Sequence, residues 1–106
     1  MSTEDMGDQP DISALINKAP LMVFMKGKPT EPLCGFSRTL IEILWENLLC
    51  FDSYDVMSNY NVFQGLKKLS NCETYPQVFV KGVFAGDLNT IKTLQKSGDL
   101  VNKLKM

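Results

Sequence analysis

The chain has 106 residues, a formal net charge of −1 and no histidine. This length suits a single domain, and the balanced charge, with no basic stripe, argues against nucleic acid as a partner. Because histidine is absent, Ser-His-Asp triads, Cys-His proteases and His-ligated metal centres cannot be completed within the chain, so any chemistry must rest on other groups or on a borrowed ligand.

The first half of the chain predicts helix, strand, helix and strand in that order. Asp11 can cap a short first helix. Residues 21–25 form a continuous apolar run, which is typical of a strand buried on both faces. After a loop over 26–33, apolar residues at helical spacing predict a helix from about 36 to 48. Residues 50–56 alternate loosely as a second strand, and this order predicts a right-handed parallel crossover.

The second half of the chain predicts further helices around a hairpin. The expected elements are a helix over about 62–69, strands over 77–80 and 83–85, a helix over 87–98 and a short helix over 99–105. Lys81-Gly82 is typical of a tight turn between the two strands, and Asp87 is a suitable cap for the helix that follows. Together the elements predict an α/β fold, with a mixed four-stranded sheet flanked by helices.

The ends of the chain and its cysteines indicate the compartment. Residues 1–10 are expected to be a disordered acidic tail and 11–106 a single domain. The tail has neither the basic character of a transit peptide nor the apolar stretch of a secretory signal, and no apolar run is long enough for a membrane span. Three widely spaced cysteines, Cys34, Cys50 and Cys72, are too few for a disulfide-stapled secreted domain. We therefore expect a reducing compartment, the cytoplasm or the nucleus.

Cys34 is the candidate reactive residue. It lies where a loop ends and a long amphipathic helix is expected to begin, close to unpaired backbone N–H groups and the positive end of a helix dipole. Lys26, Lys28 and Arg38 are near it in sequence. Both effects favour the thiolate, which is the nucleophilic and metal-binding form. The plainer alternative is a cysteine that only packs near a helix start.

Residues 26–37, KGKPTEPLCGFS, closely resemble the active-site segment of the CGFS-type monothiol glutaredoxins. The likeness continues through QGLK at 64–67, SN at 70–71, TYPQ at 74–77 and Lys81-Gly82, so that it covers roughly residues 12–104. The resemblance implies a thioredoxin fold with a cis peptide bond before Pro76, opposite Cys34. A strand-initiating proline is the plainer reading of Pro76.

The resemblance also implies that Cys34 is the catalytic thiol and that it works with glutathione. Carried over by position, Lys26 binds a glutathione carboxylate, Tyr75 pairs through its backbone with the tripeptide, and the start of the last long helix holds the γ-glutamyl end, as suits an anion at a helix N-terminus. The full set of glutathione-binding residues implied is Lys26, Cys34, Phe36, Phe63, Gln64, Thr74, Tyr75, Pro76, Asp87, Leu88 and Asn89.

Members of this family bind a [2Fe–2S] cluster across a dimer. Such a cluster usually needs four thiolates. One Cys34 and one glutathione from each of two subunits complete that number, which makes Cys34 the expected metal ligand and a homodimer the expected cluster-loaded form. The resemblance further suggests a BolA-like partner.

Several positions depart from the family pattern, and they gather in the expected glutathione pocket. Phe63 stands where the family typically has an arginine, Cys72-Glu73 replaces Trp-Pro, and Asp87 and Asn89 replace a glycine and an aspartate. The changes at Phe63, Asp87 and Asn89 each point toward weaker glutathione binding. Alternatively, Asp87 caps the helix with its side chain turned away and Phe63 belongs to the core or is an exposed aromatic. Cys50 is expected to be a buried small hydrophobe, and Cys72 is a candidate to approach Cys34 closely enough to form a disulfide.

The leading hypothesis is a monothiol glutaredoxin that binds glutathione and a bridging [2Fe–2S] cluster, in iron–sulfur cluster carriage and thiol redox homeostasis. The first alternative is an enzyme, at most a weak glutathione-dependent thiol–disulfide oxidoreductase that removes glutathione from proteins. The second is a degenerate glutaredoxin domain that serves as a protein-interaction module. Neither nucleic acid nor a membrane is an expected partner.

Overall fold

The computed structural model describes residues 11–105 of the chain, so the expected tail over 1–10 lies outside the described residues. Its centre is a four-stranded sheet in the order β4-β1-β5-β6, in which β1 (Leu21–Met25) is parallel to β4 (Asp52–Asp55) and antiparallel to β5 (Gln77–Val80), and β6 (Val83–Asp87) is antiparallel to β5. The mixed four-stranded sheet is therefore confirmed, as is the parallel pairing of its first two strands.

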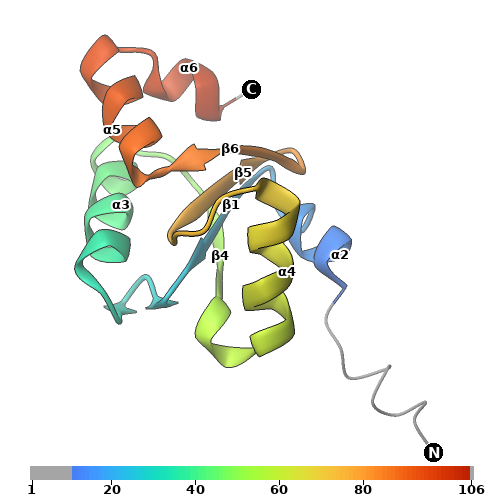
Figure 1. Ribbon diagram of the computed structural model, residues 1–106. Helices are drawn as coiled ribbons and strands as arrows, with labels where there is room; N and C mark the ends of the chain where they lie inside the picture. Colours follow the sequence, from blue (N-terminus) through green and yellow to red (C-terminus); the bar gives the residue numbers. More distant parts are fainter. Residues whose placement is uncertain (1–10, 106) are drawn as a thin grey trace, which may run out of the picture.

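Helices cover both faces of this sheet (Figure 1). One face carries α3 (Gly35–Glu46), α5 (Leu88–Ser97) and α6 (Leu100–Leu104), and the other carries α2 (Ile12–Ile16) and α4 (Tyr60–Ser70). Alternate residues of β1 point to opposite faces, so Val23 packs with the first group and Phe24 with the second. This two-sided burial explains why the strand is apolar at every position rather than at every second one.

The turn between β5 and β6 has the backbone geometry that its sequence predicts. Lys81 and Gly82 have φ values of 50° and 83°, and two consecutive positive φ angles are the mark of a type I′ hairpin turn. The twist of this turn matches the twist of the strands that it joins. Because the turn fixes the register of the hairpin, it also fixes where β6 ends and α5 begins.

Two short elements were not predicted. The expected loop over 26–33 contains a small hairpin of β2 (Gly27–Lys28) and β3 (Glu31–Pro32), and a single 3-10 turn, η1 (Val56–Ser58), follows β4. Gly27 has φ of 92°, and a Cβ atom there would lie 2.6 Å from the carbonyl oxygen of Glu31. Only glycine therefore lets the chain fold back on itself directly before the thiol.

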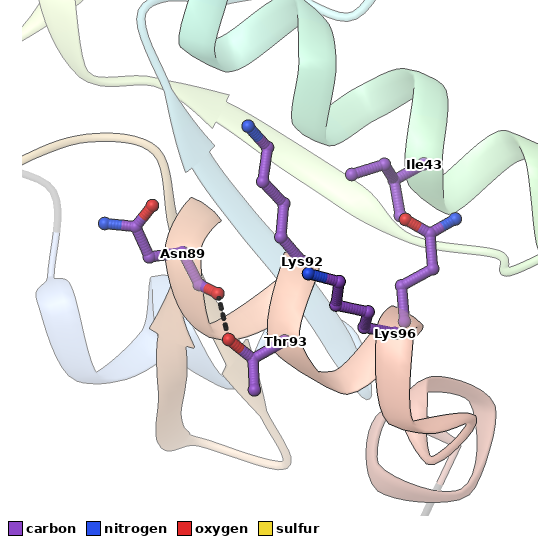
Figure 2. A pocket seen from close by; sticks show the side chains of 6 residues that line it. Ile43, Asn89, Lys92, Thr93 and Lys96 are labelled. Atoms are coloured by element: carbon purple, nitrogen blue, oxygen red, sulfur yellow. Dashed lines mark hydrogen bonds between the residues drawn. The ribbon is translucent and has the colours of Figure 1, made fainter.

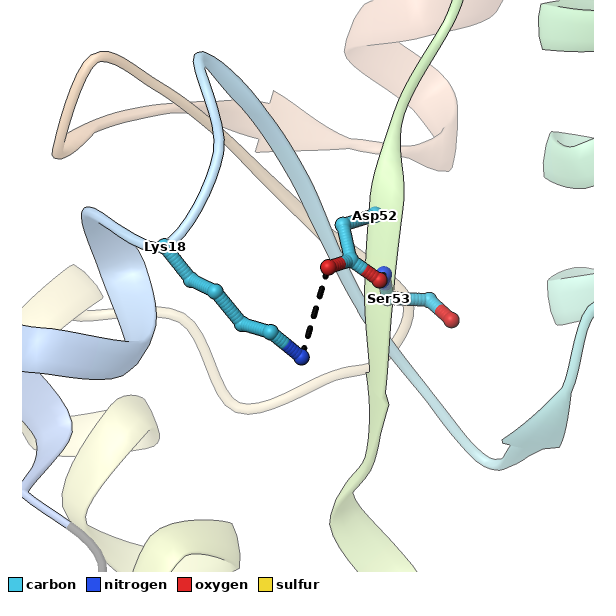
Figure 3. Close-up of polar contacts among 3 residues, drawn as sticks. All are labelled: Lys18, Asp52 and Ser53. Atoms are coloured by element: carbon cyan, nitrogen blue, oxygen red, sulfur yellow. Dashed lines mark hydrogen bonds and ion pairs between the residues drawn. The ribbon is translucent and has the colours of Figure 1, made fainter.

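A surface ion pair ties the segment after α2 to the edge strand β4 (Figure 3). Lys18 Nζ lies 3.3 Å from Asp52 Oδ2, and both side chains are about half exposed. The other carboxylate oxygen of Asp52 accepts from the backbone N–H of Ser53 at 2.8 Å. Such exposed pairs contribute at most about 1 kcal/mol, so the pairing of β4 with β1 rather than this ion pair holds β4 in place.

Within residues 11–105, no helix is both long enough and apolar enough to cross a membrane.

Candidate thiol site and ligand pocket

Cys34 is the N-cap residue of α3. Its backbone is extended, with φ of −147° and ψ of 156°, and its Sγ accepts a hydrogen bond from the backbone N–H of Ser37 at 3.4 Å. The structure therefore places this sulfur at the helix start, as the sequence predicts. A cysteine is an unusual cap, because sulfur is a weaker acceptor than the oxygen of Ser, Thr, Asp or Asn.

The side chain of Ser37 completes the surroundings of the sulfur. Ser37 is fully buried, its Oγ lies 3.3 Å from Cys34 Sγ, and it accepts a hydrogen bond from the backbone N–H of Lys26 at 3.3 Å. Because the N–H of Lys26 occupies an acceptor position of the hydroxyl, the hydroxyl proton is available to donate to Cys34 whenever the sulfur is a thiolate. The hydroxyl thus joins the end of β1 to the reactive atom.

Several groups together lower the pKa of Cys34 below its ordinary value. Partial burial acts in the opposite direction and raises this pKa, but it is outweighed by the hydrogen bonds of the Ser37 side chain and backbone, by the backbone N–H of Phe36 and by the positive charge of Lys26. The hydrogen bonds and the charge of Lys26 stabilise the thiolate. The arrangement therefore favours a nucleophilic or metal-binding sulfur, and the charge of Lys26 contributes to it.

The segment opposite this helix start carries a cis peptide bond between Tyr75 and Pro76, as the family resemblance implies. Gln77, which follows it, is fully buried, and its Nε2 donates to the carbonyl oxygens of Cys72 at 3.0 Å and Thr74 at 3.2 Å. A side chain from β5 thus anchors the loop that leads into the cis bond.

A pocket lies between the start of α3, this loop and the start of α5. Its lining residues are Phe36, Thr74, Tyr75, Pro76, Asp87, Leu88, Asn89 and Lys92. Seven of them belong to the residues that the resemblance assigns to glutathione. Lys92 was missed, because its place in the middle of a helix gives no signal in the sequence. Lys26, Cys34, Phe63 and Gln64 are not among the lining residues.

Asp87 caps α5 from within this pocket. Its Oδ1 accepts from the backbone N–H of Thr90 at 3.1 Å and from the Thr90 hydroxyl at 3.3 Å. The residue before it, Gly86, has φ of 143°, and a Cβ there would meet the side chain of Thr90 at 2.5 Å. The capping role foreseen for Asp87 is therefore confirmed, and the carboxylate occupies part of the helix start that would otherwise be open to an anionic ligand.

Phe63 lies on α4 and is partly buried. Its ring packs at 5.2 Å from the ring of Tyr75, and Lys67 Nζ lies 4.3 Å from its centre. The Tyr75 hydroxyl donates to the backbone carbonyl of Phe63 at 2.7 Å, and burial, followed by the charge of Cys72, raises the pKa of Tyr75. Phe63 is thus part of a contact between α4 and the cis-proline loop.

The two other cysteines differ from each other. Cys50 is exposed and precedes β4, so the expectation of a buried small hydrophobe is wrong. The strand begins only at Asp52, two residues later, and Cys50 lies in the irregular segment between α3 and β4. Cys72 is partly buried, and its Sγ lies 3.6 Å from the Thr74 hydroxyl. All three cysteines are free thiols.

Comparison with known proteins agrees with this geometry. A family model described as Glutaredoxin matches residues 21–85. Glutaredoxin 3 of Danio rerio is 48% identical over 99 residues, and Monothiol glutaredoxin-4 of Saccharomyces cerevisiae is 49% identical over 78 residues, covering 93% and 74% of this chain. The solution structure of a monomeric truncated mutant of 1-C-Grx1 from Trypanosoma brucei superposes with a TM-score of 0.79 at 34% identity, covering 90% of this chain and 86% of that one.

The sheet order and the thiol at the start of α3 therefore define a thioredoxin-fold protein. Within that class, the chain belongs to the glutaredoxin family, and its close relatives are monothiol glutaredoxins. The chain spans 30% and 32% of the length of the two curated relatives above.

Proposed function

We propose that this chain is a monothiol glutaredoxin that binds glutathione and carries a [2Fe–2S] cluster shared between two copies. The observation that carries the proposal is the Cys34 sulfur at the N-cap of α3, with a lowered pKa, beside a pocket made by Phe36, the cis-proline loop and the start of α5. Thiolate sulfur is the ligand that iron–sulfur clusters require.

The donor set of a single chain fits a shared cluster rather than one held by one chain. Within residues 11–105, no three His, Cys, Asp or Glu side chains gather in a group that could hold a metal ion. Cys34 supplies one thiolate, and a glutathione held in the adjoining pocket supplies a second. Two copies then provide the four thiolates that a [2Fe–2S] cargo usually needs.

The residues around the pocket have separable tasks in this proposal. Ser37 and the backbone N–H groups lower the pKa of the sulfur, Lys26 supplies positive charge beside it, and Thr74 to Pro76 line the side of the pocket where the tripeptide is expected to lie. The open N–H groups at the start of α5 suit a carboxylate, although Asp87 already occupies one of them. Because Asp87 occupies this N–H group, we expect glutathione to bind more weakly here than in relatives that have an uncharged residue at position 87.

The test is reconstitution without oxygen, with iron, sulfide and glutathione. We expect a coloured protein with visible absorption bands that elutes as a dimer, and a colourless monomer for Cys34→Ser. Cys50→Ser is the matched control, because its thiol is exposed and lies outside the pocket, and it is expected to behave like the wild type. A colourless monomeric wild type contradicts the proposal.

A second candidate function, removal of glutathione from proteins, is favoured by the lowered pKa of Cys34. The thiolate attacks the glutathione sulfur of a mixed disulfide, the substrate sulfur leaves and takes a proton from water, and a Cys34–glutathione disulfide remains. A second glutathione thiolate attacks that disulfide, which releases oxidised glutathione and restores the Cys34 thiolate. Turnover of a glutathionylated peptide above background, lost in Cys34→Ser, is the test.

A BolA-like partner and a cytoplasmic or nuclear location stay predictions.

A further inference from the structure

A second groove runs between α3 and α5, next to the pocket beside the thiol. It is lined by Ile43 of α3 and by Asn89, Lys92, Thr93, Gln95 and Lys96 of α5 (Figure 2). Ile43 provides an apolar floor, and the other side chains are polar or positively charged. Among these residues only Asn89 was predicted to bind glutathione, so the glutathione proposal leaves most of the groove without a role.

The groove adjoins the thiol pocket. Asn89 and Lys92 line both of them. Figure 2 shows the side chain of Lys92 rising from α5 on the side of α3. A molecule that occupies the thiol pocket and extends beyond it along α5 therefore enters this groove.

The groove is locally positive in a chain whose net charge is −1. Within residues 11–105, neither Lys92 nor Lys96 has a carboxylate oxygen within ion-pairing distance, and the acidic residues of α3, Glu42 and Glu46, do not line the groove. Lys96 lies in the last turn of α5, where a cation also complements the helix dipole. Lys92 lies mid-helix and has no such structural role.

We propose that this groove docks an acidic segment of the protein whose cysteine reaches Cys34. The inference rests on the proposed thiol chemistry and adds a class of partner to it. Unpaired lysines beside an apolar floor complement a short, extended run of Asp or Glu in preference to a neutral or basic one.

The dimensions of α3 predict the spacing of the acidic residues. Phe36, at the thiol pocket, and Ile43, at the groove, are seven residues apart on the helix, which corresponds to about 10 Å. An extended chain advances about 3.3 Å per residue. The acidic residues are therefore expected roughly three to five positions from the reactive cysteine of the partner.

The test measures binding alone, so that its result does not depend on disulfide exchange. Fluorescent peptides carry serine at the place of the reactive cysteine, and either glutamates or lysines three to five positions away. We expect the glutamate peptide to bind at least about fivefold more tightly at low salt, with a preference that shrinks as salt is added. Cys34 chemistry plays no part in this measurement. The proposed exchange reaction is tested in a separate assay, with a small glutathione mixed disulfide as substrate, so the two proposals can fail independently.

Charge reversal locates the binding site. Lys96→Glu is expected to remove the preference for the glutamate peptide, whereas Lys103→Glu, an equal change of charge at an exposed lysine of α6 outside the groove, is expected to retain it. Equal binding of the two peptides, or equal loss in the two variants, overturns the proposal. An oligonucleotide of matched charge that binds as tightly as the glutamate peptide also overturns it, since the groove would then select charge and not a protein segment.

Discussion

Two helices on the same face of the sheet begin in the same way but with different capping atoms. At the start of α3, Cys34 Sγ accepts from the backbone N–H three residues later at 3.4 Å, and at the start of α5, Asp87 Oδ1 accepts from the equivalent N–H at 3.1 Å. The carboxylate of Asp87 caps its helix and offers no nucleophile for disulfide exchange. A sulfur in the same position is a weaker cap, but the same N–H groups stabilise its charged form.

The comparison shows how one local geometry serves both stability and reactivity. The two capping atoms differ in the side chain that each contacts besides the backbone N–H. Asp87 receives a second hydrogen bond from the exposed residue Thr90, while Cys34 faces the buried hydroxyl of Ser37.

Cys34→Asp turns the first helix start into a copy of the second. We expect the rate of disulfide exchange with a glutathione mixed disulfide to fall on the order of a thousandfold, because the nucleophile is gone. The free energy of unfolding is expected to exceed that of Cys34→Ala by about 1 kcal/mol, because aspartate is a better cap than alanine. Exchange kinetics and denaturant unfolding measure the two effects. Exchange that persists near the wild-type rate would show that Cys50 or Cys72 is the nucleophile.

Ser37→Ala removes the hydroxyl that faces the sulfur. The pKa of Cys34 is expected to rise toward its ordinary value, and the alkylation rate at neutral pH to fall by about fivefold to tenfold, since a hydrogen bond to a charged group is lost. Measuring alkylation by iodoacetamide across pH separates a moved pKa from a slower thiolate. Ser70→Ala, which removes a hydroxyl bonded to the carbonyl of Leu66 on α4, is the matched control. An unchanged pH profile for Ser37→Ala would mean that the helix start alone ionises Cys34.

Asp87 separates capping from charge when two substitutions are compared. Asp87→Ala is expected to lower the free energy of unfolding by about 1 kcal/mol, whereas Asp87→Asn keeps the cap and costs little. Because Asn removes the negative charge from the pocket, it is expected to tighten glutathione binding, as measured by calorimetry. If Asp87→Asn binds glutathione no better than the wild type, the carboxylate does not oppose the ligand.

The smallest expected effect is the dependence of stability on pH. The pKa of Cys34 is lowered in the folded state from 9.0, so between the folded-state and ordinary values the unfolded chain binds more protons than the folded one. The wild type should therefore gain stability relative to Cys34→Ala as pH rises through this window, and lose the gain as pH falls through the folded-state pKa. Urea unfolding of both proteins across the window measures the difference. A constant difference would contradict a stabilised thiolate.

Much of the fold was open to prediction because its signals are local. The apolar run of β1, the cap at Asp87 and the Lys81-Gly82 turn each specify their own conformation, and all three were confirmed. The hairpin before the thiol was missed because its prolines indicate a loop, and its folding back depends on a contact of Gly27 with Glu31. Local sequence signals predict single helices, strands and turns, whereas contacts between residues separated in the chain cannot be predicted from a local sequence pattern.

The candidate site likewise has features that local sequence predicts and features that depend on contacts between distant residues. Cys34 at a helix start follows from neighbouring residues, but its partner Ser37 receives the Lys26 N–H across a separation of eleven residues. Lys92 enters the pocket only because α5 packs against α3. Cys50 was misplaced for a related reason, since its exposure depends on where the turn after α3 ends and β4 begins.

The position of β1 between β4 and β5 has a consequence for any shortened form of this protein. One edge of β1 pairs with a strand that follows within thirty residues, but its other edge pairs with β5, which belongs to the last third of the chain. A polypeptide cut after Asn71 keeps the first pairing and leaves the second edge bare, with the unexposed side chains of Met22 to Met25 beside it. Open strand edges of this kind pair with other molecules. Such a fragment should therefore aggregate. In the whole chain β5 occupies this edge of β1, so the last third of the chain protects the central strand from pairing with other molecules.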